Sequence, residues 1–175
     1  EQCRIVDFLE SVDSYIDALR AQADTARAAL TALLHSEMTR FGSAIRADEV
    51  FEVRMGRQRS PQHATGIHMV PYLRAANVKD GYLDLDDVLE MNFTPDEQVT
   101  FALRGGDVLV TEGCGSREQV GASTIWRGEL PSPVCFQNTL VRIRAIEGLS
   151  TPNFAHWWAR YNFLSGAFAG VASGT

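Results

Sequence analysis

Cys114 is the residue of this sequence best placed for covalent chemistry, because it lies in the glycine-rich segment EGCGS (112–116). A thiol nucleophile also needs a neighbouring base and a group that orients the base, and the residues around Cys114 supply neither. The same segment could bind an anion through its backbone N–H groups, with help from Ser116 and Arg117, or could form a plain turn. The sequence contains no HExxH, P-loop or zinc-spaced Cys/His motif, so its residues favour binding over catalysis.

Arginine is the second residue type of interest, since it provides 15 of the 16 basic side chains. Its planar fork can bind phosphate or guanine through two hydrogen bonds. Residues 53–79 contain four arginines, two histidines and no Asp or Glu, whereas residues 80–97 contain seven acids and no Lys or Arg. The net charge of −6 argues against a protein that binds nucleic acid over its whole surface. The charge pattern is compatible with one basic face on an acidic protein and with an ordinary solvated run of charges.

The first forty residues are the element around which the chain is organised, because apolar residues follow one another there at alternating steps of four and three. This heptad pattern has no Pro or Gly before Gly42 and predicts one long coiled-coil-type helix. A single helix cannot bury such a stripe, so we expect a second helix from another copy or from missing chain. The alternative is an ordinary amphipathic helix packed on the following domain. The expected helix-pairing interface, called the apolar stripe below, comprises Ile5, Leu9, Val12, Ile16, Leu19, Ala23, Ala26, Leu30 and Leu33.

Short strands and helices are predicted for the remaining residues. Strands are expected at 49–55, 108–111, 123–127 and 139–146, with a hairpin of 72–78 and 82–85 around Asp80-Gly81. A capping box from Thr94 to Glu97 predicts a helix to about Leu103, and Thr151-Pro152 opens a last helix with an aromatic stripe. The expected fold class is α+β: a long coiled-coil-type helix at 1–41, then a mixed, mainly antiparallel β domain with short helices at 42–175.

Composition also constrains the environment of the protein. No apolar run reaches the ~20 residues of a transmembrane span, and no signal peptide opens the chain. Three cysteines far apart fit a reducing compartment better than a disulfide framework, so we expect a cytoplasmic protein without a membrane partner. The sequence starts inside the helical pattern and ends in small residues, and we expect a fragment whose second domain is truncated at its C-terminal end.

The segment EQCRIVDFLESVDSYIDAL (1–19) resembles the start of the long helix that follows a target-recognition domain in specificity subunits of type I restriction–modification enzymes. The second domain resembles such a target-recognition domain through an ordered set of pieces. These are RMGRQRSP, PYLRAANVKDGYLDLDDVLEMNF, LRGGDVLVTEG, VGASTIWRGELP and CFQNTLVRIR. Together with the helix, the pieces extend the resemblance over nearly the whole chain.

The resemblance implies a non-catalytic subunit. In this family two antiparallel helices hold two target-recognition domains apart, and each domain reads one half of a bipartite site in double-stranded DNA. The subunit docks methyltransferase subunits, which use S-adenosylmethionine, and a restriction subunit, which uses ATP and Mg²⁺, so no cofactor is expected in this chain. One helix and one domain of that pattern are present here, which leaves a half-subunit dimer, a degraded gene and an expressed fragment as open interpretations.

Base-reading residues differ among members of this family, so the DNA-binding residues are predicted from chemistry and position. Gln and Arg read adenine and guanine edges in the major groove, and arginine or hydroxyl groups also bind phosphates. The predicted DNA-binding residues are Arg54, Arg57, Gln58, Arg59, Ser60, Arg74, Ser116 and Arg117. Gln137 and Asn138 fit strand-end hydrogen bonding slightly better, and Arg142 and Arg144 could form an exposed sheet face. The acidic residues of 80–97 are expected to face away from DNA.

Two alternative functions come from other classes. The chain could be a coiled-coil oligomerisation or scaffold protein whose globular head binds protein, or an enzyme that uses Cys114. DNA binding that weakens steeply with salt would distinguish the DNA-recognition subunit from the scaffold. Loss of turnover in Cys114→Ala would identify the thiol enzyme.

Overall fold

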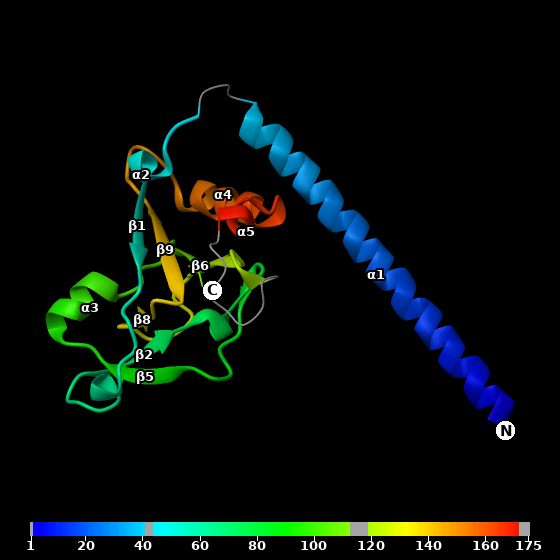
Figure 1. The fold of residues 1–175 in the computed structure, drawn as a ribbon, viewed down its shortest axis with the longest axis horizontal. Helices are drawn as coiled ribbons and strands as arrows, with labels where there is room; N and C mark the ends of the chain where they lie inside the picture. The colour runs from blue at the N-terminus through cyan, green and yellow to red at the C-terminus, as the bar shows by residue number, and fades with distance from the viewer. Residues whose placement is uncertain (1, 41–43, 113–118, 172–175) are drawn as a thin grey trace. The chain divides into compact units, whose positions relative to one another are not determined.

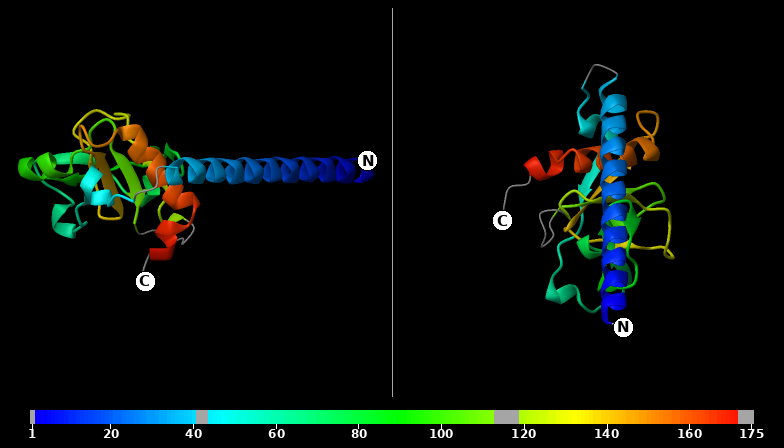
Figure 2. Two further views of the ribbon diagram at one scale, coloured as in Figure 1. Left: turned by 90° about the horizontal axis from the view of Figure 1, so that it is seen from above. Right: turned by 90° about the vertical axis from the view of Figure 1, so that its right-hand side faces the viewer.

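The computed structural model describes residues 2–40, 44–112 and 119–171, and the chain divides into two compact units, residues 1–42 and 43–175 (Figure 1). The first unit is α1 (Gln2–Thr39), a single helix of 38 residues that confirms the heptad-based prediction. At 1.5 Å per residue α1 is about 57 Å long, and Figure 2 shows that it is straight. Gly42, the predicted end of this helix, lies outside the described residues. None of the helices within the described ranges is long and apolar enough to cross a membrane.

The apolar stripe of α1 is exposed along most of its length. Leu9 is 54% exposed and Leu33 is 61% exposed, and Phe8 and Tyr15 beside the stripe are also exposed. A helix in water gains most of its stability by burying such a face against another surface. The exposed stripe therefore agrees with the expectation of a second helix, which remains a prediction.

A four-stranded antiparallel sheet forms one layer of the second unit, in the order β1-β9-β6-β7. Its strands are β1 (Phe51–Met55), β6 (Val108–Thr111), β7 (Ser123–Ile125) and β9 (Leu140–Ala145). They confirm the four predicted strands, and all but β6 are shorter than predicted. The predicted last helix is α4 (Pro152–Leu164), which Thr151 caps by accepting a hydrogen bond from the Phe154 N–H. Ala155 and Ala159 of α4 pack on alternate apolar residues of the sheet, among them Phe51.

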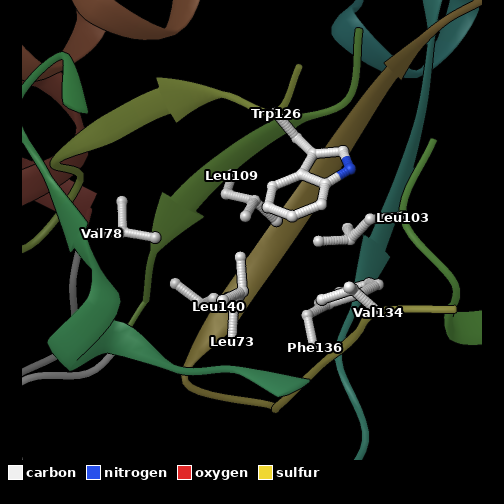
Figure 3. Packing of buried hydrophobic residues seen from close by; sticks show 8 residues of the cluster. All are labelled: Leu73, Val78, Leu103, Leu109, Trp126, Val134, Phe136 and Leu140. Atoms are coloured by element: carbon white, nitrogen blue, oxygen red, sulfur yellow. The ribbon is translucent and has the colours of Figure 1, made fainter. Parts of the chain in front are cut away.

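A second, three-stranded sheet was not predicted. It has the order β5-β2-β8, in which β2 (Met69–Leu73) pairs antiparallel with β5 (Leu89–Asn92) and parallel with β8 (Cys135–Phe136). The capping box at Thr94 opens α3 (Pro95–Phe101), as predicted, and α3 lies next to β8. Both sheets contribute to a buried cluster (Figure 3) of Leu73, Val78, Leu103, Leu109, Trp126, Val134, Phe136 and Leu140.

The predicted Asp-Gly hairpin is present, but its first arm is shorter than expected. It joins β3 (Val78–Lys79) to β4 (Tyr82–Leu83), and Gly81 adopts a φ of +86°, which glycine tolerates best. Residues expected in the first arm instead form the 3₁₀ turn η2 (Ala75–Asn77). Three further short elements were not predicted: α2 (Ala47–Val50), which overlaps the start of the strand expected at 49–55, η1 (Pro61–His63) and α5 (Ala167–Val171).

Candidate nucleic-acid interface

The basic and acidic stretches that are separate in the sequence pair with each other in the structure. Arg57 Nη2 lies 2.8 Å from Glu97 Oε1, and Arg74 forms an ion pair with Asp87. Two of the seven acidic residues of 80–97, Asp87 and Glu97, are therefore paired with arginines of the basic stretch. Because strands β2 and β5 lie side by side, the pairing of their flanking segments brings charges of opposite sign together.

Arg57 is a predicted DNA-binding residue whose side chain is only 10% exposed. Its guanidinium group donates to the main-chain oxygen of Asn92, lies 3.0 Å from His63 Nδ1 and stacks over the ring of Phe93 at 4.9 Å. Together with Glu97, these contacts use the hydrogen-bonding groups at the end of the side chain. The Arg57 side chain is therefore engaged in contacts within the protein, and little of its guanidinium group is exposed to solvent.

Arg74 has a similar position at the end of β2. Its side chain is 24% exposed and binds Asp87, and its backbone N–H donates to the side chain of Asn77 in η2. The buried Nε atom of Arg74 has no hydrogen-bond partner within the described part of the chain. The contacts of Arg74 with Asp87 and Asn77 are internal to the protein.

The other described residues of the predicted DNA-binding set are more accessible. Gln58 and Arg59 are exposed, and Ser60 precedes η1 and is half-buried. Arg54 on β1 is exposed and lies 3.6 Å from Glu52, whereas Arg59 has no ion-pair partner among residues 2–40, 44–112 and 119–171. These four residues therefore lie together on β1 and the segment that follows it. Ser116 and Arg117, like Cys114, lie outside the described residues.

The sequence left open an exposed sheet face for Arg142 and Arg144, and this interpretation is wrong because neither side chain is exposed. The Arg142 side chain is 1% exposed, forms an ion pair with Glu52 and lies over the ring of Phe136 at 5.7 Å. It also reaches the carbonyl of Thr100 in α3, which shows that α3 covers this part of the sheet. Burial lowers the pKa of the Arg142 guanidinium from its ordinary value.

Arg144 lies two residues after Arg142 on β9 and binds a buried carboxylate that was not predicted from the sequence. Asp107 is 1% exposed, and its two oxygens lie 2.6 Å and 2.7 Å from Arg144 Nε and Nη2. The hydrogen bond to Asp107 raises the pKa of Arg144. Asp107 also accepts from the backbone N–H of Arg104 at 2.7 Å. The only sequence signal was an acid directly before a strand of buried residues.

The prediction for Gln137 and Asn138 as strand-end residues agrees with the structure. The Gln137 N–H donates to Leu73 at 2.9 Å, and the Asn138 N–H donates to Arg57 at 3.0 Å. Cys135 is buried, and burial raises its thiol pKa to about 12, which keeps it protonated and unreactive at neutral pH. The described residues contain no cluster of three or more His, Cys, Asp or Glu side chains that could hold a metal.

His156 on α4 leads to a prediction about pH. Burial is the main cause that lowers its pKa below 6.5, with Arg160 and Arg127 adding repulsion. A histidine with a lower pKa in the folded state binds fewer protons there, so acid favours unfolding. We expect the free energy of unfolding to fall as the pH drops below about 6.5, and to fall less in His156→Gln. Urea unfolding of the wild type and His156→Gln at about pH 7.5 and about pH 5 measures these decreases. Equal decreases in the two proteins would show that His156 is not responsible for the pH dependence.

The comparisons with known proteins bear on the fold. No protein-family model matches the sequence, and no curated protein does. Among solved structures, the chain is similar to the crystal structure of the HsdS subunit from Thermoanaerobacter tengcongensis, with a TM-score of 0.59 and 18% sequence identity. The similarity covers 97% of this chain and 41% of that subunit. The resemblance predicted from the sequence is thus confirmed at the level of the fold: this chain has the HsdS-like arrangement of a long helix followed by a mixed sheet domain.

Proposed function

We propose that this chain is a DNA-recognition fragment of a type I restriction–modification specificity subunit and has no catalytic activity of its own. HsdS subunits are the specificity subunits of these systems, the family whose sequence motifs the chain resembles. The observation that carries the proposal is the extent of the structural similarity, which covers 97% of the chain and so includes both the long helix and the following domain.

In this proposal the second unit reads one half of a bipartite site in double-stranded DNA, and α1 is one of two rods that set the distance between the halves. The exposed apolar stripe supports the need for a second helix, from another copy or from missing chain. The subunit docks methyltransferase subunits that bind S-adenosylmethionine and a restriction subunit that binds ATP and Mg²⁺. The chain itself needs no cofactor for this role, and it acts in the cytoplasm.

The exposed residues on β1 and the following segment are the DNA contacts that we favour. Arg54, Gln58, Arg59 and Ser60 offer the donors and acceptors that read bases or hold phosphates. Arg59 is exposed and has no ion-pair partner in the described part of the chain, whereas Arg54 lies 3.6 Å from Glu52. Arg57 and Arg74 contribute to DNA binding mainly by supporting this surface, because their charges are engaged with Glu97 and Asp87. For Ser116 and Arg117 the proposal rests on the sequence alone.

A selection experiment tests the proposed function. The full chain, alone and together with methyltransferase subunits, is incubated at low salt with a pool of random duplexes, and the bound DNA is sequenced. We expect one short sequence to be enriched, and we expect the affinity for it to fall steeply as salt is added, because phosphate contacts release counterions. If no sequence is enriched in either setting, the proposal fails.

Arg59→Ala is expected to weaken DNA binding by about 1–3 kcal/mol, since each base-reading or phosphate contact is worth roughly that much. The free energy of unfolding should stay unchanged because the Arg59 side chain is exposed. Fluorescence anisotropy with the selected duplex measures the affinity. Arg104→Ala is the matched control, as Arg104 is another exposed arginine, on the segment between α3 and β6. Equal losses in both variants would mean that only the overall charge matters.

The exposed apolar stripe alone would also suit a coiled-coil scaffold protein whose head binds protein. This second candidate predicts stable self-association through α1 and no enriched duplex at any salt concentration. The DNA-recognition fragment predicts the enriched duplex. The selection experiment therefore separates the two functions, whereas a measurement of oligomeric mass does not.

A further inference from the structure

Asn92, at the end of β5, contacts the polar segment between β1 and β2 near both of its ends. The main-chain oxygen of Asn92 accepts a hydrogen bond from Arg57 Nη1, and its side-chain Oδ1 accepts one from the backbone N–H of His68 at 2.9 Å. The His68 carbonyl in turn accepts from the Phe93 N–H at 3.0 Å. Asn92 thereby closes residues 58–67 into a loop.

Two glycines allow this closure. A Cβ atom on Gly66 would lie 2.2 Å from Asn92 Oδ1, and a Cβ atom on Gly56 would lie 2.3 Å from the carbonyl oxygen of Gln137. Both distances are far below a normal contact, so a side chain at either position would push the loop away from the strands. The base of the loop therefore has a defined geometry that depends on Gly56, Gly66 and Asn92.

The tip of the loop is also ordered, and a large apolar side chain, that of Ile67 at the base, is exposed to water. The 3₁₀ turn η1 is held by hydrogen bonds from the His63 N–H to Ser60 and from the Ala64 N–H to Pro61. Figure 1 shows this turn, in teal, at the end of β1 opposite α2. Ile67 lies between Gly66 and His68, both of which contact Asn92, so its backbone is held in place while its side chain is 92% exposed. A residue presented in this way loses little conformational freedom when it binds a partner.

We propose that residues 58–67 form a preorganised DNA-reading loop in which Ile67 contacts the 5-methyl group of a thymine in the major groove. This inference rests on the DNA-recognition function proposed above. Asn92 and Arg57 are the positioning residues of the loop. The loop contains two glutamines, one arginine and no acid, and these residue types read adenine and guanine. An apolar side chain adds the contact that distinguishes thymine. The positive charge and these side chains favour DNA over a protein as the partner.

The test compares the base preferences of three proteins in the duplex selection described above: the wild-type chain, Ile67→Ser and Ile45→Ser. Ile45 is the matched control because it is 63% exposed and lies before α2 and β1 in the chain, outside the 58–67 loop. We expect Ile67→Ser to lower the preference for thymine at one position of the half-site by about fivefold or more, because a mismatched base pair costs at least this much in typical complexes. Its stability and the other positions should not change, and Ile45→Ser should match the wild type.

The outcomes separate this inference from the proposed function. If the wild type enriches no sequence, both the proposed function and the inference about the loop are wrong. If the wild type enriches a sequence and Ile67→Ser keeps the same preferences, the proposed function stands and the inference is overturned. The inference also fails if Ile67→Ser loses only its affinity for methyltransferase subunits, since the loop is then a protein contact.

The role of Asn92 is tested separately by trypsin cleavage after Arg59 and by DNA affinity. Asn92→Ala removes the acceptor for the His68 N–H, whereas Asn92→Asp keeps an oxygen at that position. We expect about tenfold faster cleavage after Arg59 in Asn92→Ala, because the loop opens locally more often, together with weaker binding to all duplexes. Asn92→Asp should restore slow cleavage. Wild-type cleavage and affinity in Asn92→Ala would show that Asn92 does not position the loop.

Discussion

Replacing Asp107 with alanine is expected to lower the free energy of unfolding by about 3–5 kcal/mol, the usual cost of removing one partner from a buried ion pair. The carboxylate is 1% exposed and accepts two hydrogen bonds from Arg144 and one from the backbone N–H of Arg104. Alanine would leave the Arg144 guanidinium, itself only 17% exposed, with the carbonyl of Ala102 as its remaining hydrogen-bond partner. Urea unfolding followed by tryptophan fluorescence measures the change.

A double substitution shows whether the loss of stability comes from leaving the Arg144 charge without its partner. Asp107→Ala combined with Arg144→Met removes both charges and keeps most of the side-chain volume on β9. We expect the double variant to recover most of the stability, because a buried ion pair can often be replaced by apolar residues at little cost. An Asp107→Ala protein as stable as the wild type would contradict the importance of the pair. If the double variant is no more stable than Asp107→Ala, the lost stability comes from the hydrogen bond between Asp107 and the Arg104 N–H.

The second large effect is expected in α1, where Leu9→Asp combined with Ile16→Asp should abolish helix pairing. Both residues belong to the apolar stripe, and each substitution would place a charge without a partner in an apolar interface. We expect the dissociation constant of the paired helices to rise by about a hundredfold or more, which corresponds to roughly 3 kcal/mol. Analytical ultracentrifugation of the full chain over a range of concentrations measures it.

Ser14→Asp combined with Ala21→Asp is the matched control for the pairing prediction. These positions are on the face of α1 opposite the apolar stripe in the heptad, and both are exposed. The control variant gains the same charge and has a similar helix propensity, so its oligomeric mass should equal that of the wild type. Unchanged mass and thermal stability in Leu9→Asp/Ile16→Asp would rule out pairing of two copies through the apolar stripe.

Local signals in the sequence predicted a large part of the fold. The heptad pattern predicted α1, and the capping box predicted α3. Thr151-Pro152 predicted the start of α4, and Asp80-Gly81 predicted the β3–β4 turn. Each of these signals depends on residues close together in the chain. The three-stranded sheet has no such signal, because β8 is two residues long and Pro71 interrupts the pattern of β2. Its strands are defined by pairing between distant segments, such as Tyr72 with Cys135.

The candidate site was harder to predict for the same reason. The arginines of 53–79 were correctly identified as a group of interest, but the sequence does not reveal that Glu97 and Asp87 return to pair with Arg57 and Arg74. Alternation in β9 correctly put Arg142 and Arg144 on one face, yet whether α3 covers that face depends on tertiary packing. Ile67 and Asn92 became visible only through exposure and hydrogen bonding in the folded chain.

The closure of the 58–67 loop by Asn92 has a consequence for how such a domain can diversify. The contacts that fix the loop involve Gly56, Gly66, main-chain atoms and the side chains of Arg57 and Asn92. The side chains of Gln58, Arg59 and Ile67 are not part of the buried core. Substitutions at those three positions are therefore decoupled from folding stability. New surface chemistry can accumulate there, one residue at a time, on an unchanged scaffold.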